Sequence, residues 1–190
     1  GEQTAIGVDV ARGGDDQTVI ATLRGNRFDE LHKFAGRTTP DGQSVVDLML
    51  PVLTDGGVCG IDVIGVGASV YDMARSRGFD VTGINFAEHT NATDKSGRLR
   101  FANVRAQAYW ALREALDPAD GHNIALPDDA EILGDLRAPR WKMQTNGIQI
   151  ESKDDIRKRI GRSTDCGDAV ALAWLAANTV TNVRYRPSIY

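Results

Sequence analysis

Four aspartates in three separate parts of the sequence have surroundings suited to binding a divalent metal ion. Asp9 lies in the apolar run that opens the chain, and Asp62 lies in a second apolar run, Val58 to Ile64. Asp165 and Asp168 stand three residues apart in an apolar stretch further along. An ionised carboxylate in an apolar strand needs a compensating cation or hydrogen bonds. The pattern therefore predicts that these acids share a cation.

The chemistry expected of such a site is phosphodiester hydrolysis. Ligand sets made only of oxygen favour Mg²⁺ or Mn²⁺. Two such ions activate a water and stabilise the leaving oxygen of an in-line displacement, so no nucleophilic side chain is needed. Cys59 and Cys166 are far apart and lack the spacing of zinc ligands, and the three histidines have no spacing suited to a metal or a hydrolytic triad.

The elements expected to position the acids alternate between strands and helices. Period-two and helical apolar patterns, with turn residues between them, predict the order of elements. The first part of the chain is expected to contain strands at Thr4–Val10, Thr18–Leu23 and Arg27–Phe34, a helix at Asp41–Leu53, a strand at Val58–Ile64, a helix from Gly65 to about Arg77, and a strand at Val81–Phe86. The turn between the second and third strands is Arg24-Gly-Asn26.

The second part of the chain is expected to be mainly helical. Helices are predicted at Arg98–Leu116, Asp128–Leu136, Asp154–Ile160 and Asp165–Val180, and the first of these places Arg105 away from its apolar side. Thr145-Asn-Gly147 predicts a β-hairpin with a type I′ turn. Together the patterns indicate one domain over residues 1–190, an α/β fold with a mixed sheet, flanking helices and an added hairpin.

Composition restricts the partners less than local charge does. The 190 residues carry a formal net charge of -4, which argues mildly against a nucleic-acid partner. Lys153 to Arg162 is nevertheless mostly basic and is either a DNA-binding surface or a solvated helix face. No apolar run reaches the roughly 20 residues that cross a bilayer, so no membrane partner is expected.

Four segments carry a more specific resemblance that spans nearly the whole chain. They are Gly7-Val-Asp-Val-Ala-Arg-Gly-Gly-Asp15, Gly60-Ile-Asp-Val-Ile-Gly-Val-Gly-Ala-Ser-Val-Tyr-Asp72, Glu151-Ser-Lys153 and Gly161-Arg-Ser-Thr-Asp-Cys-Gly-Asp-Ala169. They resemble successive motifs of the C-terminal nuclease domain of bacteriophage large terminase subunits, which implies an RNase H-like fold. The final motif has Thr164 where proline is usual, which leaves the balance between Asp165 and Asp168 open.

The resemblance implies roles for individual residues. Asp9, Asp62 and Asp168 match the catalytic, metal-binding acids, Asp165 matches an additional metal-binding acid, and Asp15 matches a second-metal ligand. Asp15 is equally well explained as a turn residue. Lys153 is expected to contact a phosphate or to hold a carboxylate of the site. Further DNA contacts are expected from three residues of the basic run, Arg157, Lys158 and Arg162.

The function that the resemblance implies is metal-dependent cutting of concatemeric viral DNA during genome packaging. The implied partners are double-stranded DNA, the terminase ATPase domain, the portal and the small terminase, in the cytoplasm of an infected bacterial host. The chain lacks a phosphate-binding loop of the ATPase type, so the motor domain is expected to be absent. Two alternatives are a junction-resolving or transposase-like RNase H-fold nuclease, and a catalytically weak docking module for packaging partners.

Overall fold

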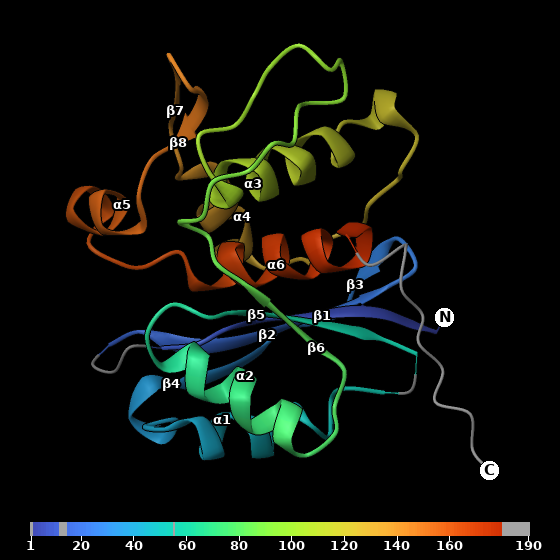
Figure 1. Ribbon diagram of the computed structural model, residues 1–190, viewed down its shortest axis with the longest axis vertical. Helices are drawn as coiled ribbons and strands as arrows, with labels where there is room; N and C mark the ends of the chain where they lie inside the picture. The colour runs from blue at the N-terminus through green and yellow to red at the C-terminus, as the bar shows by residue number, and fades with distance from the viewer. Residues whose placement is uncertain (1, 12–14, 55, 180–190) are drawn as a thin grey trace.

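A computed structural model describes residues 2–11, 15–54 and 56–179 of the chain. Figure 1 shows one mixed sheet with helices on both of its faces. The strand order is β3-β2-β1-β5-β6, and β4 also pairs with β2. β1 is antiparallel to β2 and parallel to β5, which is in turn parallel to β6. The strands of this sheet are β1 (Gln3–Asp9), β2 (Gln17–Arg24), β3 (Arg27–Phe28), β4 (His32–Ala35), β5 (Val58–Asp62) and β6 (Val81–Ile84).

The helices form two layers around this sheet. One face is covered by α1 (Gly42–Met49) and α2 (Val66–Ser76), and the other by α6 (Asp165–Thr179). Outside α6 lie α3 (Val104–Ala115), α4 (Ala130–Arg137), α5 (Lys153–Ile160) and a hairpin of β7 (Trp141–Gln144) and β8 (Gly147–Ile150) (Figure 1). Short 3₁₀ helices occupy Gly36–Thr38 and Pro118–Asp120. The predicted α/β class, with a mixed sheet, flanking helices and an added hairpin, is confirmed.

The alternation of side chains along β1 decides which layer receives its acid. Ile6 and Val8 point into the core shared with α1 and α2, whereas Ala5 belongs to the core shared with α6. Successive side chains of a strand point to opposite faces. Asp9 therefore faces the α6 layer, as Ala5 and Gly7 do.

Small residues let α6 lie directly on β1. A Cβ atom at Gly7 would stand 2.1 Å from the carbonyl oxygen of Ala169 and 2.3 Å from the backbone nitrogen of Ala173. Such an approach is possible only where the strand has no side chain. The amino-terminal turn of α6 is thereby brought close to the carboxyl end of β1.

Two predicted elements are interrupted in the structure. The strand expected at Arg27–Phe34 is divided into β3 and β4, because residues 29–31 stand opposite only two residues of β2 and the pairing is interrupted there. The helix expected from Arg98 begins only at Val104, because the Asn103 side chain caps it by accepting from the Ala106 N–H.

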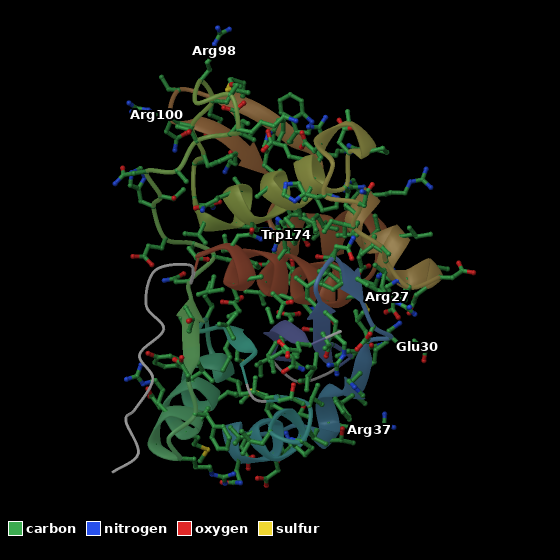
Figure 2. The ribbon with its side chains drawn as sticks, turned by 90° about the vertical axis from the view of Figure 1, so that its right-hand side faces the viewer. Arg27, Glu30, Arg37, Arg98, Arg100 and Trp174 are labelled. Carbon is green, nitrogen blue, oxygen red and sulfur yellow. The ribbon has the colours of Figure 1, made fainter. Side chains whose placement is uncertain are left out.

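The segment before α3 is instead extended and reaches the hairpin. Arg100 forms a bridge with Thr93, and Phe101 forms one with Ile148 of β8. Figure 2 shows Arg98 and Arg100 at this end of the molecule, pointing away from its body, while Trp174 of α6 lies among the layers. Residues 98–103 thus form an extended segment that pairs with β8 and leads into α3, instead of lengthening the helix.

The hairpin turn differs from the predicted type. Gln144 pairs with Gly147, so the two connecting residues are Thr145 and Asn146. Asn123 is the one residue other than glycine with a positive φ in the described ranges, whereas a type I′ turn would require this of Asn146. Gly147, at φ +121°, is needed because a Cβ there would stand 2.3 Å from the carbonyl oxygen of Arg100.

The helices of the described ranges include none that is both long enough and apolar enough to span a membrane.

Candidate metal centre

Two of the predicted acids end neighbouring parallel strands. Asp9 is the last residue of β1 and Asp62 the last of β5, and the pair before them, Val8 and Ile61, is in register. The two carboxylates therefore leave the sheet at the same edge. Asp9 is only 3% exposed, whereas Asp62 is half-buried and accepts a hydrogen bond from the Ile64 N–H at 3.1 Å.

The other two acids lie in the first turn of α6, and a residue of α4 holds this helix end. Asp135 is fully buried, and its Oδ2 accepts from the N–H groups of Cys166 and Gly167 at 3.0 and 3.2 Å. These are amino-terminal donors that the helix itself leaves unpaired. Asp135 thus fixes the position from which Asp165 and Asp168 extend toward β1.

Lys153 joins the acids of β1 and α6. It is the first residue of α5, directly after the cap Ser152. Its Nζ lies 2.8 Å from Oδ2 of Asp9, 2.9 Å from Oδ1 of Asp165 and 3.1 Å from Oδ2 of Asp168. Lys153 was expected to contact a phosphate or to hold a carboxylate of the site, and in the structure it holds carboxylates.

The opposite oxygen of Asp168 is held by two residues of α3. Oδ1 accepts from Nη1 of Arg105 at 2.6 Å and from the hydroxyl of Tyr109 at 2.5 Å. Arg105 was expected on the polar side of its helix, but the structure buries it, so that expectation was wrong. The available signal was the spacing of Arg105 and Tyr109 by one helical turn, which places both on one face.

Burial and neighbouring charge affect the acids differently. Burial raises the pKa of Asp9 well above its usual range, although the charge of Lys153 opposes this. Burial of Asp168 acts in the same direction, but the charges of Arg105 and Lys153 outweigh it and lower the pKa of Asp168. The pKa of Tyr109 is raised by its burial and by the adjacent Asp168, so its hydroxyl remains a donor. Asp168 therefore stays ionised beside Arg105 and Lys153.

The acids open into one pocket of about 480 Å³. Asp168, 1% exposed, lies behind its wall, which Asp9, Asp62 and Asp165 help to line. The other lining residues come mainly from the loops after β1 and β6, the start of α3, β8 and α5: Val10, Ala11, Asp16, Ile64, Phe86, Ala87, Asn103, Arg105, Gln149, Ile150, Ser152, Lys153, Asp154, Arg157 and Ser163.

The acidic turn after β1 contributes its second aspartate to the pocket. Asp15 is exposed in a turn and does not line the pocket, so the structure does not bring it together with the other acids. Asp16 does line it and forms a bidentate pair with Arg157, with N–O distances of 2.5 and 3.1 Å. Asp16 was not among the predicted site residues, and its place in the sequence beside Asp15 and two glycines favours a turn rather than a site.

The predicted DNA-binding cations are dispersed around the pocket. Lys153 and Arg157 line it, whereas Lys158 and Arg162 do not. The Lys158 side chain is 79% exposed, and Arg162 binds the buried Asp135. Arg162 therefore supports the anchor of α6 in this structure.

The donor set of this cluster fits a hard divalent cation. Four aspartates, Asp9, Asp62, Asp165 and Asp168, stand around Lys153 and Arg105, so negative charge is in excess. Carboxylate oxygens are the ligands that Mg²⁺ and Mn²⁺ prefer. In the ranges that the structure describes, no three His, Cys, Asp or Glu side chains are already grouped around one metal position. The Lys153 ammonium stands between the three carboxylates that it contacts.

Comparisons with known proteins agree on the fold. No family model matches the chain, and no curated protein sequence matches it. Among solved structures, the nuclease domain of the large terminase subunit gp2 of bacterial virus Sf6, a lysine-to-alanine mutant with manganese and β-thujaplicinol, matches with a TM-score of 0.67 and 16% identity, covering 91% of this chain and 86% of that one.

Two further structures come from other phages, one of them thermophilic. The large terminase nuclease of phage G20c with bound cobalt matches with a TM-score of 0.60 and 21% identity, covering 90% of this chain and 79% of that one. The large terminase nuclease domain of a Thermus phage matches with a TM-score of 0.57 and 19% identity, covering 90% and 77%. The structural neighbours are thus consistently nuclease domains of phage large terminases, and this chain has their RNase H-like fold.

Proposed function

We propose that this chain is a divalent-metal-dependent endodeoxyribonuclease domain that cuts concatemeric phage DNA during genome packaging. The observation that carries the proposal is the convergence of Asp9, Asp165 and Asp168 on one ammonium beside Asp62. These acids come from β1, β5 and α6. If no metal ion were ever bound, the cost of burying their charges together would have to be offset in another way.

The ligands that we propose for the metal are Asp9, Asp62, Asp165 and Asp168. Bound Mg²⁺ or Mn²⁺, as two ions in catalysis, would supply an activated water and stabilise the leaving oxygen. Large terminase nuclease domains with this fold have been solved with manganese, cobalt, magnesium and calcium. Asp15 stands outside this set.

The residues around these acids would then have separate roles. Arg105 and Tyr109 hold one oxygen of Asp168 and leave the other, Oδ2, directed toward Lys153. Lys153 holds the carboxylates of two elements together, and its ammonium exchanges these contacts for a DNA phosphate when another cation balances the acids. Arg157, bound to Asp16 at the pocket wall, contributes positive charge where the DNA backbone must approach.

The likeness of fold to phage terminase nuclease domains supports a wider role, which we also propose. Double-stranded DNA is the proposed substrate, and the proposed partners are the terminase ATPase domain, the portal and the small terminase. We further propose that the 190 residues form one nuclease domain, which in the cell acts in the cytoplasm of the infected bacterium.

Plasmid cleavage tests the proposal. The parent is incubated with Mg²⁺, Mn²⁺ or EDTA beside Asp9→Asn, Asp62→Asn and Asp168→Asn, each checked for folding by circular dichroism. Asp47→Asn is the matched control, because Asp47 is exposed on α1 and pairs only with surface groups. We expect cutting with either metal, none with EDTA, and loss in the three site variants alone. Metal-independent cutting, or full activity in the site variants, would contradict the proposal, and an inactive parent would favour a docking module.

A further inference from the structure

Arg105 is bound on one side and unpaired on the other. Its side chain is 9% exposed, and its guanidinium carbon lies 4.8 Å from the ring centre of Tyr109 and 5.7 Å from that of Phe86. Nη1 donates to Asp168. The remaining nitrogens, Nε and Nη2, are buried and have no hydrogen-bond partner in the described part of the chain.

The two unpaired nitrogens form one edge of the guanidinium plane. That edge presents two parallel N–H donors, an arrangement that matches two oxygens of a phosphate or carboxylate. Buried polar groups are nearly always hydrogen-bonded, and an unpaired one of positive charge is especially costly. A free edge of this kind indicates an oxyanion ligand.

The place of Arg105 in the pocket favours a phosphate of DNA as that ligand. Arg105 lines the wall beside Phe86, Ala87 and Asn103, where the amino end of α3 also lies. The backbone N–H of Arg105 already bonds to Phe86, and the next one bonds to the Asn103 side chain. These backbone donors are therefore taken, whereas the guanidinium edge of Arg105 keeps two donors on this wall.

The other cations of the pocket are occupied by acids. Lys153 contacts three carboxylates, and Arg157 is paired on its fork with Asp16. A phosphate that enters among so many carboxylates needs a cation that keeps donors for it. Arg105 can bind Asp168 through Nη1 and a phosphate through Nε and Nη2 at the same time.

We infer that Arg105 is a phosphate-binding residue, which grips a backbone phosphate of the DNA strand through its Nε and Nη2 edge after a small shift of the Phe86 to Asn103 wall. The inference rests on the proposed nuclease function and adds to it a substrate contact that is independent of metal. Arg105 thereby links the strand being cut to Asp168.

Metal-free DNA binding tests this inference. Binding of a fluorescent 20-base-pair duplex is measured by anisotropy in EDTA over a series of salt concentrations. For Arg105→Gln we expect about tenfold weaker binding, since a charge-assisted pair is lost, and a log-log salt slope smaller by about 0.9, the value for one phosphate contact. Arg105→Lys keeps the charge and the slope but loses the fork, so it binds about threefold more weakly.

Two control variants separate this role from others. Tyr109→Phe removes the other hydrogen bond to Oδ1 of Asp168 and leaves the guanidinium in place, so metal-free affinity and slope should equal those of the parent. Arg75→Gln removes an equal charge from α2, on the opposite face of the sheet, and should also change neither.

The outcomes distinguish the two proposals. Equal binding by the parent and Arg105→Gln, or equal losses in Arg105→Gln and Tyr109→Phe, would overturn the Arg105 site while a cutting parent still supports the nuclease. If Arg105→Gln does not fold, the comparison of Arg105→Lys with Tyr109→Phe decides, and equal affinities overturn the site. A parent that neither binds nor cuts DNA refutes the nuclease function, and the Arg105 site with it.

Discussion

Replacing Lys153 by alanine should destabilise the metal-free protein and make it more responsive to metal. The ammonium contacts Asp9, Asp165 and Asp168, of which the first and last are almost completely buried. Removing one partner of a buried charge cluster costs about 3–5 kcal/mol. Because the Lys153 side chain is 31% exposed and partly screened by solvent, we take the lower value of about 3 kcal/mol.

The expected change can be stated as a melting temperature. For a chain of this length, about 1 kcal/mol corresponds to 2–4 °C, so Lys153→Ala should melt roughly 6–12 °C below the parent in EDTA at pH 7. Adding Mn²⁺ should raise the melting temperature of Lys153→Ala more than that of the parent, since no ammonium need be displaced from the carboxylates. For comparison, a ligand at one hundred times its Kd adds about 2.7 kcal/mol to the free energy of unfolding.

The pH dependence has a definite sign. The pKa of Lys153 is raised in the folded state, so its contribution is present throughout the range below its ordinary pKa of about 10.4. The pKa of Asp9 is also raised, and a carboxyl with a raised pKa favours the folded state more as it takes up a proton. A protonated Asp9 has less need of the ammonium. The difference in melting temperature between the parent and Lys153→Ala should therefore become smaller as the pH falls.

Differential scanning calorimetry in EDTA and in Mn²⁺ measures these effects. Lys158→Ala is the matched control, because Lys158 is 79% exposed and lies 3.8 Å from Asp155, a surface pair worth about 1 kcal/mol at most. Equal melting of parent and Lys153→Ala in EDTA, with equal shifts on adding Mn²⁺, would refute the view that the ammonium replaces a metal ion.

Three further predictions concern the residues that place the acids. Gly7→Ala should lose about 3 kcal/mol of unfolding free energy in urea, because its Cβ would overlap the Ala169 carbonyl of α6. Tyr109→Phe should lose about 1 kcal/mol, for one buried hydrogen bond, and cut plasmid more slowly, because Asp168 loses a restraint. Burial raises the pKa of Asp135 to about 6, so unfolding free energy should decline as the pH rises from about 4 to 7, and Asp135→Asn should flatten that decline in urea titrations at several pH values. An unchanged stability of Gly7→Ala, an unchanged cutting rate of Tyr109→Phe, or an unchanged pH profile of Asp135→Asn would contradict the respective prediction.

The strands and the meeting of their acids could be predicted because both depend on local patterns. Asp9 and Asp62 each lie in a continuous apolar run that predicts a buried strand, and neighbouring parallel strands present their carboxyl ends at one edge of a sheet. Asp165 and Asp168 share a helix face through their spacing alone. The roles assigned to these residues and to Lys153 stay predictions until the variants are tested.

The partners of Asp168 could not be predicted, because the contact joins distant segments. Arg105 and Asp168 are 63 residues apart, and a single arginine on an amphipathic helix is normally exposed. The late start of α3 and the hairpin turn depend likewise on the approach of residues 100 and 101 to β8. Such tertiary contacts override local propensity, and the spacing of residues within one helix does not name their partner on another.

The separation of the acids along the chain also has a consequence for timing. The ribosome adds Asp9 well before Asp168, so at 5–20 residues per second Asp9 meets its helix partners only about ten to thirty seconds after it is made. Contacts this distant form slowly, because a long loop must close first. A nascent chain that ends before residue 168 therefore carries no assembled acid cluster, and such partial products lack the site that we propose for cutting DNA.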